Sequence, residues 1–240
     1  METLTQKLTN WIKNKVITAK AKGVIIGLSG GIDSAVVAIL CKRAFPDNTL
    51  ALIMPCHSLT EDIECALSFA KKYDIYYKII DLSKIYDSFI SLLDGKEKYA
   101  NFKLEKANIK PRLRMITLYY FANKLNYIVV GTGNKSEITI GYFAKYGDGG
   151  IDILPLGNLL KSQVIELAKY LEIPYEIIQK PPSAGLWKGQ TDEEEIGISY
   201  KQLDEYLRTG KLNNKMIEKK IQDKINKSAH KRTIPEKPNF

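Results

Sequence analysis

Residues 24–34, V-I-I-G-L-S-G-G-I-D-S, decide how this chain folds. Residues 24–28 form a short apolar run, which is typical of a strand buried on both faces of a parallel sheet. Gly30 and Gly31 then allow a tight turn, and the pattern of residues 35–44 predicts a helix. A strand, a glycine-rich loop and a helix in this order predict the start of an α/β fold.

Four more apolar runs follow, and helical patterns separate most of them. The runs predicted to be strands cover residues 50–54, 76–80, 127–131 and 151–154. The other predicted helices cover residues 1–20, 60–73, 83–93, 111–125 and 159–171. We therefore expect a doubly wound parallel sheet of five strands, Rossmann-like, with flanking helices. Such sheets bind their ligands at the carboxyl ends of the strands.

The composition is that of a folded protein without membrane segments. Hydrophobic residues make up 45% and charged residues 26% of the 240 residues, near the averages of globular proteins. No apolar run approaches the roughly 18 residues that a membrane span needs, and the first residues lack the apolar centre of a secretory signal. The three cysteines have no C-x-x-C spacing, which argues against disulfides and structural zinc. We expect a cytoplasmic protein with no membrane partner, built as a single domain over residues 1–240.

The charge is unevenly distributed. The formal net charge of +9 favours anionic partners, of which a nucleotide, a nucleic acid and a membrane surface are the alternatives. Residues 211–232 alone hold eight basic and two acidic residues. We therefore expect residues 211–240 to form a basic, helical tail.

Residues 180–190, K-P-P-S-A-G-L-W-K-G-Q, are predicted to form a lid-like loop. Two prolines and two glycines disfavour regular structure there. Leu186 and Trp187 are nevertheless apolar, and a permanently exposed loop rarely carries such residues. The alternative is a static surface loop with Trp187 packed on the domain.

The segment from Gly27 to Ser34 has the features of a phosphate-binding loop. Its glycines let backbone amides approach an anion, the hydroxyl groups of Ser29 and Ser34 add donors, and the following helix dipole favours negative charge. It is neither a Walker loop nor a dinucleotide fingerprint. Asp33 would repel phosphates unless a divalent cation lay between them, so we expect it to bind magnesium. The alternative is that Asp33 is only a helix N-cap.

The string S-G-G-I-D-S resembles the pyrophosphate loop of the ATP pyrophosphatase superfamily, in which ATP is cleaved between its α and β phosphates. Longer motifs narrow the resemblance. They are N-I-K-P-R-L-R-M (residues 108–115), G-T-G-N-K-S-E (131–137), Y-G-D-G-G (146–150), P-P-S-A-G-L-W (181–187) and H-K-R (230–232). With them, nearly the whole chain is similar to ammonia-dependent NAD synthetases. One departure is Pro111, where relatives often have alanine.

This resemblance implies a fold of the adenine nucleotide alpha hydrolase type and an enzyme, a ligase that forms a C–N bond. ATP and ammonia would convert deamido-NAD (nicotinic acid adenine dinucleotide) to NAD through an adenylated intermediate, with AMP and pyrophosphate as the other products. The implied cofactor is Mg²⁺, and the implied assembly is a homodimer that binds no nucleic acid.

The resemblance also implies a role for individual residues. The ATP-binding residues would be Gly27, Leu28, Ser29, Gly30, Gly31, Ile32, Asp33, Ser34, Thr132, Lys161 and Ser183. The deamido-NAD-binding residues would be Asn108, Arg112, Lys145, Asp148, Asp152, His230 and Lys231. Asp33 and Glu137 would bind the metal, and the catalytic set would be Asp33, Glu137, Lys161 and Asp148, the last as a stabiliser of ammonium.

Plainer interpretations stay open at this point. Lys145 and Asp148 could form an exposed ion pair, and Lys161 could be a solvated helix residue. The acidic residues 192–195 are most simply the charged start of a helix. At the level of function, the alternatives are a tRNA-modifying enzyme of the same superfamily, which the basic tail suggests, and a non-catalytic nucleotide-binding module.

Overall fold

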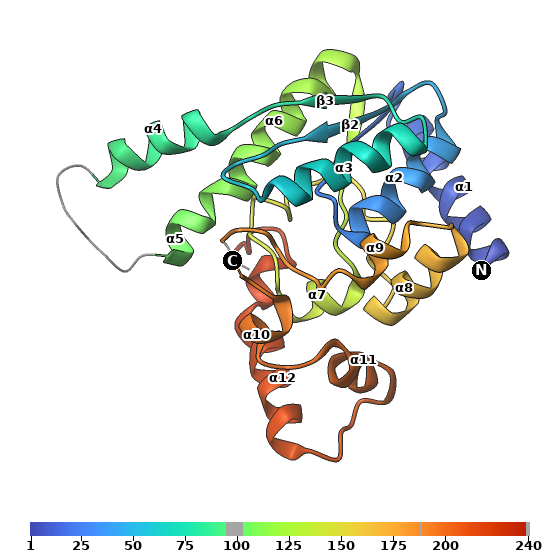
Figure 1. Cartoon of the computed structure of the whole chain (residues 1–240). Coiled ribbons are helices and arrows are strands. Elements are labelled where there is room, and N and C mark those ends of the chain that lie inside the picture. The colour runs from blue at the N-terminus through green and yellow to red at the C-terminus, as the bar shows by residue number, and fades with distance from the viewer. Residues whose placement is uncertain (95–102, 188, 239–240) are drawn as a thin grey trace.

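Four parallel strands form the sheet, in the order β3-β2-β1-β4. The computed structural model describes residues 1–94, 103–187 and 189–238 of the chain (Figure 1). The strands are β1 (Gly23–Gly27), β2 (Thr49–Ile53), β3 (Tyr77–Ile79) and β4 (Tyr127–Val130). The register aligns Ile25 of β1 with Leu50 on one side and with Val129 on the other. β1, the strand that precedes the phosphate loop, therefore lies inside the sheet, between β2 and β4.

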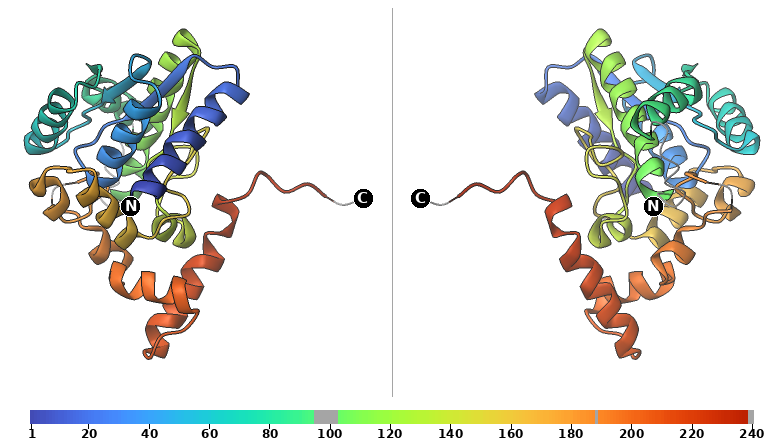
Figure 2. Two further views of the ribbon diagram at one scale, coloured as in Figure 1. Left: turned by 90° about the vertical axis from the view of Figure 1, so that its right-hand side faces the viewer. Right: turned by 90° about the vertical axis from the view of Figure 1, so that its left-hand side faces the viewer.

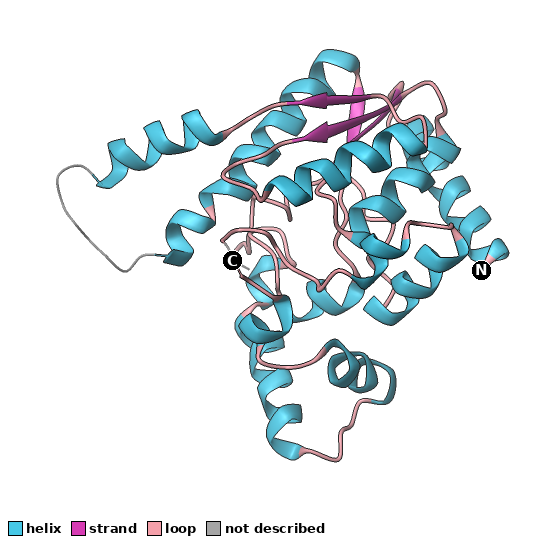
Figure 3. Cartoon of the chain, in the orientation of Figure 1, coloured by secondary structure: helices cyan, strands magenta, loops and turns pink. Residues whose placement is uncertain are grey.

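Helices cover both faces of this sheet, as Figure 3 shows by colour. Val24 and Ile26 of β1 point into one hydrophobic core, and Ile25 points into another, as the alternation along a strand requires. The first core is closed by α1 (Glu2–Thr18), α2 (Ile32–Ala44), α3 (Thr60–Lys72) and α8 (Lys161–Tyr170). The second is closed by α6 (Ile109–Leu125), with α4 (Ser83–Asp94) at its edge. The predicted doubly wound architecture is confirmed.

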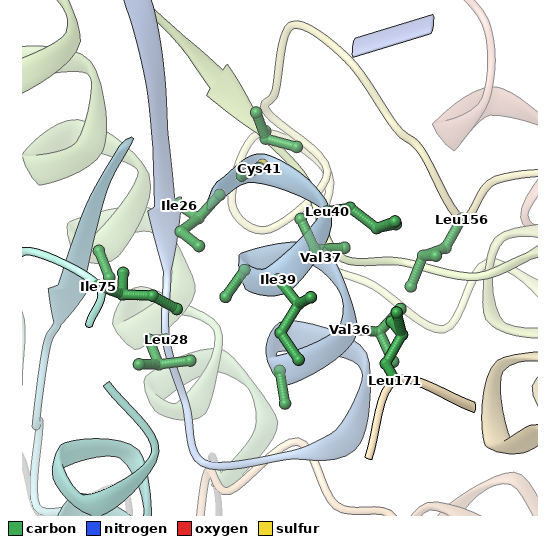
Figure 4. Close-up of a cluster of buried hydrophobic side chains, with 14 of the residues drawn as sticks. Ile26, Leu28, Val36, Val37, Ile39, Leu40, Cys41, Ile75, Leu156 and Leu171 are labelled. Carbon is green, nitrogen blue, oxygen red and sulfur yellow. The ribbon is translucent and has the colours of Figure 1, made fainter. Parts of the chain in front are cut away.

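The helix after the phosphate loop, α2, is enclosed on almost every side. Val36, Val37, Leu40 and Cys41 are fully buried, and Figure 4 shows them among side chains from the sheet and from the segment around Leu156. A helix that is apolar all round is stable only inside a protein, because each face needs a partner. The loop at its N-terminus is therefore anchored to a helix that is packed on almost every side.

A third hydrophobic core lies among the C-terminal helices, which are below the sheet in Figure 1. The remaining helices are α5 (Lys103–Ala107), α7 (Lys135–Ile140), α9 (Tyr175–Gln179), α10 (Asp192–Ile196), α11 (Tyr200–Thr209), α12 (Lys215–Lys227) and the 3₁₀ helix η1 (Ala229–Lys231). Ile140, Ile196, Leu203 and Ile221 join α7, α10, α11 and α12. The basic segment predicted over residues 211–240 is helical in α12. The chain then extends away from the body (Figure 2), and residues 239–240 lie outside the described part.

The fifth strand, predicted at residues 151–154, is wrong. Its only pairing in the described structure is a single parallel bridge between Val130 and Ile153. The backbone N–H groups of Asp152 and Ile153 both point to the carbonyl of Val129, at 3.0 and 3.3 Å. The N–H of Val129 donates instead to the Asp152 side chain, at 2.8 Å. The Asp152 carboxylate thus accepts the hydrogen bond that a backbone carbonyl would accept in a regular parallel pair. Regular strand pairing between β4 and residues 151–154 therefore does not continue.

Two exclusions made from the sequence concern membranes and disulfides. Within the described ranges, no helix is both long and apolar enough to cross a bilayer. Cys41, Cys56 and Cys65 are all free, and the first two are buried. Burial raises the pKa of the Cys41 thiol well above its usual value, so this thiol is uncharged and packs as a small apolar group.

We predict that Asp152→Ala lowers the free energy of unfolding by about 1–3 kcal/mol, because it leaves the buried Val129 N–H without an acceptor. Tyr119→Phe is the control, since it removes only the second bond of this carboxylate, from the Tyr119 hydroxyl at 2.8 Å, and should cost about 1 kcal/mol or less. Urea unfolding measures both. Unchanged stability in Asp152→Ala would contradict this account.

Candidate active site

A cavity of about 460 Å³ opens at the carboxyl ends of β1 and β4. Its walls come from the phosphate loop, the loop after β4, the start of α8, residues 180–186 and the start of α10. This is the position at which an open α/β sheet binds its ligand, and the volume suits a nucleotide-sized molecule.

The phosphate loop is held in shape by its two serines. The Ser34 hydroxyl donates to the Gly31 carbonyl at 2.8 Å, and the backbone N–H of Ser29 donates to the Ser34 oxygen at 3.2 Å. Gly30 has φ +82°, and a Cβ there would lie 2.5 Å from the carbonyl oxygen of Asp62. Only glycine fits this turn without strain. The loop is thus built for a close approach of its backbone to an anion.

Asp33, Glu137 and Lys161 form a cluster of charges in the cavity, in which Lys161 is buried and the two carboxylates are 17% and 15% exposed. They come from α2, α7 and α8, so three separate helices meet there. The Lys161 Nζ lies 2.5 Å from Asp33 Oδ2 and 3.2 Å from Glu137 Oε1. Asn134 orients both acids: its Nδ2 donates to Asp33 Oδ1 at 2.9 Å, and its backbone N–H donates to Glu137 Oε2 at 3.2 Å. The interpretation of Lys161 as a solvated residue does not hold, because its side chain is only 3% exposed.

The electrostatics of this cluster follow from burial. Desolvation disfavours the Lys161 ammonium, but Asp33 and Glu137 outweigh it, so the pKa of Lys161 lies above its ordinary value. Desolvation and the nearby Asp33 charge raise the pKa of Glu137 to about 7, against the opposing effect of Lys161. The carboxylates of the cluster therefore carry more negative charge than the single Lys161 ammonium neutralises.

These residues fit a magnesium ion that binds together with substrate phosphates. Among the described residues, no group of three or more histidine, cysteine or acidic side chains forms a closed metal site. Mg²⁺ does not need one, since it usually keeps several waters and takes one or two carboxylates plus phosphate oxygens. Asp33 and Glu137 supply two carboxylates beside the phosphate loop.

Two residues of the cluster were not singled out from the sequence. The Tyr200 hydroxyl lies 2.9 Å from Asp192 Oδ2 and 3.2 Å from Glu137 Oε1, and its ring centroid is 5.1 Å from Lys161 Nζ. Asp192 is 4% exposed, and within the described structure its Oδ1 has no hydrogen-bond partner. The acidic stretch at residues 192–195 does open a helix, but its first member is a buried part of the site rather than a solvated charge.

Two cations of α6 were also missed, although both lie within the N-I-K-P-R-L-R-M motif. Arg114 lines the cavity and donates to the carbonyl oxygen of Met54 at 3.1 Å. Lys110 is buried and donates to the carbonyl oxygen of Leu186 at 2.8 Å. The motif itself was the available signal, but it does not say which of its cations face the cavity.

Most residues that the resemblance nominated line this one cavity. They are Gly27, Leu28, Ser29, Gly31, Ile32, Asp33, Ser34, Asn108, Thr132, Glu137, Asp148, Lys161, Ser183 and Lys231. Gly30, Arg112, Lys145, Asp152 and His230 are not among its lining residues. Gly30 shapes the loop, and both Asp152 oxygens are engaged by Tyr119 and Val129.

Arg112, Lys145 and His230 lie together beside the cavity. Arg112 donates to the Lys145 carbonyl at 3.3 Å, and Lys145 Nζ donates to the His230 carbonyl at 2.5 Å. Asp148 accepts from the Ala144 N–H at 2.8 Å rather than pairing with Lys145. Lys231 Nζ donates to the carbonyls of the same segment, at Gly141 and Phe143, both at 2.8 Å. Lys145 and Lys231 thus hold the segment of residues 141–148 against the C-terminal residues, and Arg112 holds it against α6.

The predicted lid, residues 180–190, lies over the cavity in this structure. Residues 180–186 line the cavity, Lys180 pairs with Asp62, and Lys110 holds the Leu186 carbonyl. Gln190 accepts from the Leu186 N–H at 2.8 Å and so fixes the two ends of the turn. Lys188 lies outside the described residues. Movement of this loop stays a prediction.

We predict that Lys161→Met destabilises the metal-free protein by about 3–5 kcal/mol at about pH 8, because two buried carboxylates lose their cation. The loss should be smaller at about pH 5, since Glu137 already has a raised pKa and takes up a proton there. Unfolding with EDTA present measures it. Adding Glu137→Gln to Lys161→Met should recover part of the stability, and equal stability of the single and double variants would disprove the charge argument.

The chain was compared with known proteins. A sequence model of the NAD synthase family matches residues 4–235. The NH(3)-dependent NAD(+) synthetase of Carboxydothermus hydrogenoformans is 51% identical over 239 residues, which cover 99% of this chain and 97% of that protein. The structure of NMN synthetase from Francisella tularensis matches with a TM-score of 0.93 at 42% identity, covering 100% of this chain and 98% of that one. The structure of NH3-dependent NAD synthetase from Campylobacter jejuni, in complex with nitrate, gives a TM-score of 0.81 at 35% identity, covering 99% and 98%. With matches of this extent and identity, the chain belongs to the NAD synthase family.

Proposed function

We propose that this chain is a ligase that uses ATP and ammonia to amidate deamido-NAD, giving NAD, AMP and pyrophosphate. The observation that carries the proposal is the meeting of the phosphate loop with Asp33, Lys161 and Glu137 in one cavity. A non-catalytic nucleotide-binding module has no use for buried charges that are so costly to desolvate.

The reaction needs charge neutralisation more than acid–base chemistry. The nicotinate carboxylate attacks the α phosphorus of ATP and pyrophosphate leaves; ammonia then attacks the acyl carbon of the adenylate and AMP leaves. The loop amides around Gly31 bind the phosphates, and Lys161 offsets the negative charge that grows on the leaving pyrophosphate. When bound, Mg²⁺ would be held by Asp33 and Glu137 and would neutralise further phosphate charge.

The deamido-NAD site is proposed from residues that border the same cavity. Asn108, Asp148 and Lys231 line it, and Arg112, Lys145 and His230 lie next to them. Asp148 is the proposed stabiliser of ammonium, since a carboxylate favours the cation. Asp152 would act indirectly, through the segment that it anchors to Val129.

A second candidate substrate is nicotinic acid mononucleotide. The relative described as NMN synthetase has the higher TM-score of the two solved structures compared, 0.93 against 0.81. The amidated group is the same nicotinate carboxylate in both substrates, so the phosphate loop and the charged cluster do not distinguish them. The specificity must therefore be measured.

We also propose that residues 180–190 act as a lid. An adenylate hydrolyses when water reaches it, so closure over the cavity protects the intermediate. The loop is held by polar contacts that opening would break. Lys180 pairs with Asp62, Lys110 donates to the Leu186 carbonyl, and the Pro182 carbonyl accepts from the Asp192 N–H at 2.9 Å.

A homodimer is proposed from the surface of α4 and α6. The helix α4 projects from the body in Figure 1, and its Leu92 and Leu93 are 80% and 62% exposed. On α6, Ile116 and Tyr120 are similarly exposed. Exposed apolar surface of this kind marks a protein interface, and a second copy of the chain is the partner proposed. The cytoplasmic location expected from the sequence stays a prediction.

We predict that Asp33→Asn and Glu137→Gln each lower NAD formation by roughly a hundredfold or more with little change in fold. Each substitution removes a negative charge that would pair with magnesium and with Lys161. The assay contains ATP, magnesium, ammonium and either deamido-NAD or nicotinic acid mononucleotide, and it quantifies AMP and the amidated product. Glu166→Gln, an exposed carboxylate on α8, is the control and should stay near wild type. Absence of both amidated products from the wild-type protein would refute the proposal. Near-normal turnover of Asp33→Asn or Glu137→Gln would refute the shared metal site.

We predict that light scattering gives the mass of a dimer for the wild-type protein and that Leu92→Glu shifts it to the monomer, because the charge would be buried in the interface. Met216→Glu on α12 is the matched control, since Met216 is 83% exposed and lies far along the chain from α4. A monomeric wild type that is fully active would exclude this assembly.

A further inference from the structure

Asp204 is a buried carboxylate that the proposed chemistry leaves unused. It lies on α11, is 2% exposed and does not line the active cavity. Its Oδ1 accepts from the Ser136 hydroxyl at 2.5 Å, and its Oδ2 accepts from the backbone N–H of Ser162 at 2.9 Å. In the described structure no lysine or arginine forms an ion pair with it. Burying an acid in this way is costly, so the position calls for an explanation.

The two donors to Asp204 lie at the starts of the helices that carry the charged cluster. Ser162 directly follows Lys161, the first residue of α8, and Ser136 directly precedes Glu137 in the first turn of α7. The backbone N–H of Lys161 also donates to the Ser136 hydroxyl oxygen, at 3.1 Å. One carboxylate therefore ties two helix N-termini together, where free N–H groups and the helix dipole both favour negative charge.

We propose that Asp204 is a positioning residue that sets Lys161 and Glu137 relative to each other. Because it binds the Ser136 side chain at the start of α7 and the Ser162 backbone at the start of α8, the Lys161 ammonium reaches Glu137 at 3.2 Å while it contacts Asp33. A helix of the C-terminal region thereby controls the geometry of the active site without contacting a substrate. Displacement of a catalytic group by about 1 Å can lower a rate by about a hundredfold.

Three variants and one control test this role, which rests on the proposed function for its assay. Asp204→Ala removes the carboxylate, Asp204→Asn keeps one acceptor oxygen, and Ser136→Ala removes the bridging hydroxyl. The control is Ser199→Ala, because Ser199 caps the same helix by accepting from the Gln202 N–H and, within the described structure, forms no hydrogen bond with α7 or α8. The measurements are the thermal unfolding midpoint, ATP affinity by calorimetry, and kcat and KM for amidation, with kcat expressed per folded molecule.

Asp204→Ala should lower kcat by about 10- to 100-fold, with a change of less than about threefold in KM for the nicotinate substrate. Asp204→Asn should recover part of the rate, and Ser136→Ala should show the same split between kcat and KM. Ser199→Ala should lower the thermal midpoint while it keeps kcat within about twofold, since losing a helix cap costs about 1 kcal/mol of stability.

If Asp204→Ala and Ser199→Ala have the same kcat per folded molecule, Asp204 only stabilises the fold and the proposal is overturned. If Asp204→Ala does not fold, Ser136→Ala and Asp204→Asn decide, and wild-type kcat in both overturns it as well. If the wild-type protein amidates neither nicotinate substrate, the proposed function fails separately. ATP affinity then decides: a loss of about tenfold in Asp204→Ala, with none in Ser199→Ala, supports positioning, and equal affinities reject it.

Discussion

The ammonium of Lys161 lies between two carboxylates, 2.5 Å from Asp33 and 3.2 Å from Glu137. Each of these charges would be unfavourable in the interior by itself, so none of them tolerates the loss of its partners. The three residues lie in the first turns of three different helices. Because their charges must meet, α2, α7 and α8 converge on one edge of the sheet. The cavity and the placement of the C-terminal helices beneath it follow from this convergence.

The contiguous parts of this arrangement could be predicted from the sequence. The apolar run before Gly27, the glycines of the loop and the apolar helix after it are local signals, and the structure confirms them in β1 and α2. The predicted fifth strand was wrong because the deciding contact is not local. The Asp152 side chain accepts a hydrogen bond from the backbone N–H of Val129, 23 residues away in the sequence. A pattern of apolar residues does not reveal such a bond.

The same distinction separates the site residues that sequence reasoning found from those that it missed. Motifs gave Asp33 and Glu137, because each stands in a recognisable string, and the wider family resemblance gave Lys161. Asp192 and Tyr200 were not predicted, because they reach the cluster through tertiary contacts, Asp192 from α10 and Tyr200 from α11. The sequence around each of them is that of an ordinary helix start. The resemblance nominated residues near the cavity, but it could not tell which cations line it and which, like Lys145, lie beside it and donate to a backbone carbonyl.

The enclosure of α2 has a consequence for how a nucleotide is bound. Amides of a helix that is enclosed on almost every side exchange with solvent mainly when the domain unfolds, so this helix should be among the slowest-exchanging parts of the backbone. The phosphate loop ends on that helix, and the hydroxyl groups of Ser29 and Ser34 hold it in shape. Its donors are therefore already ordered before any anion arrives, and binding requires little further loss of backbone entropy. The proposed lid is a separate segment at the rim of the cavity, so its opening would not require any change in α2.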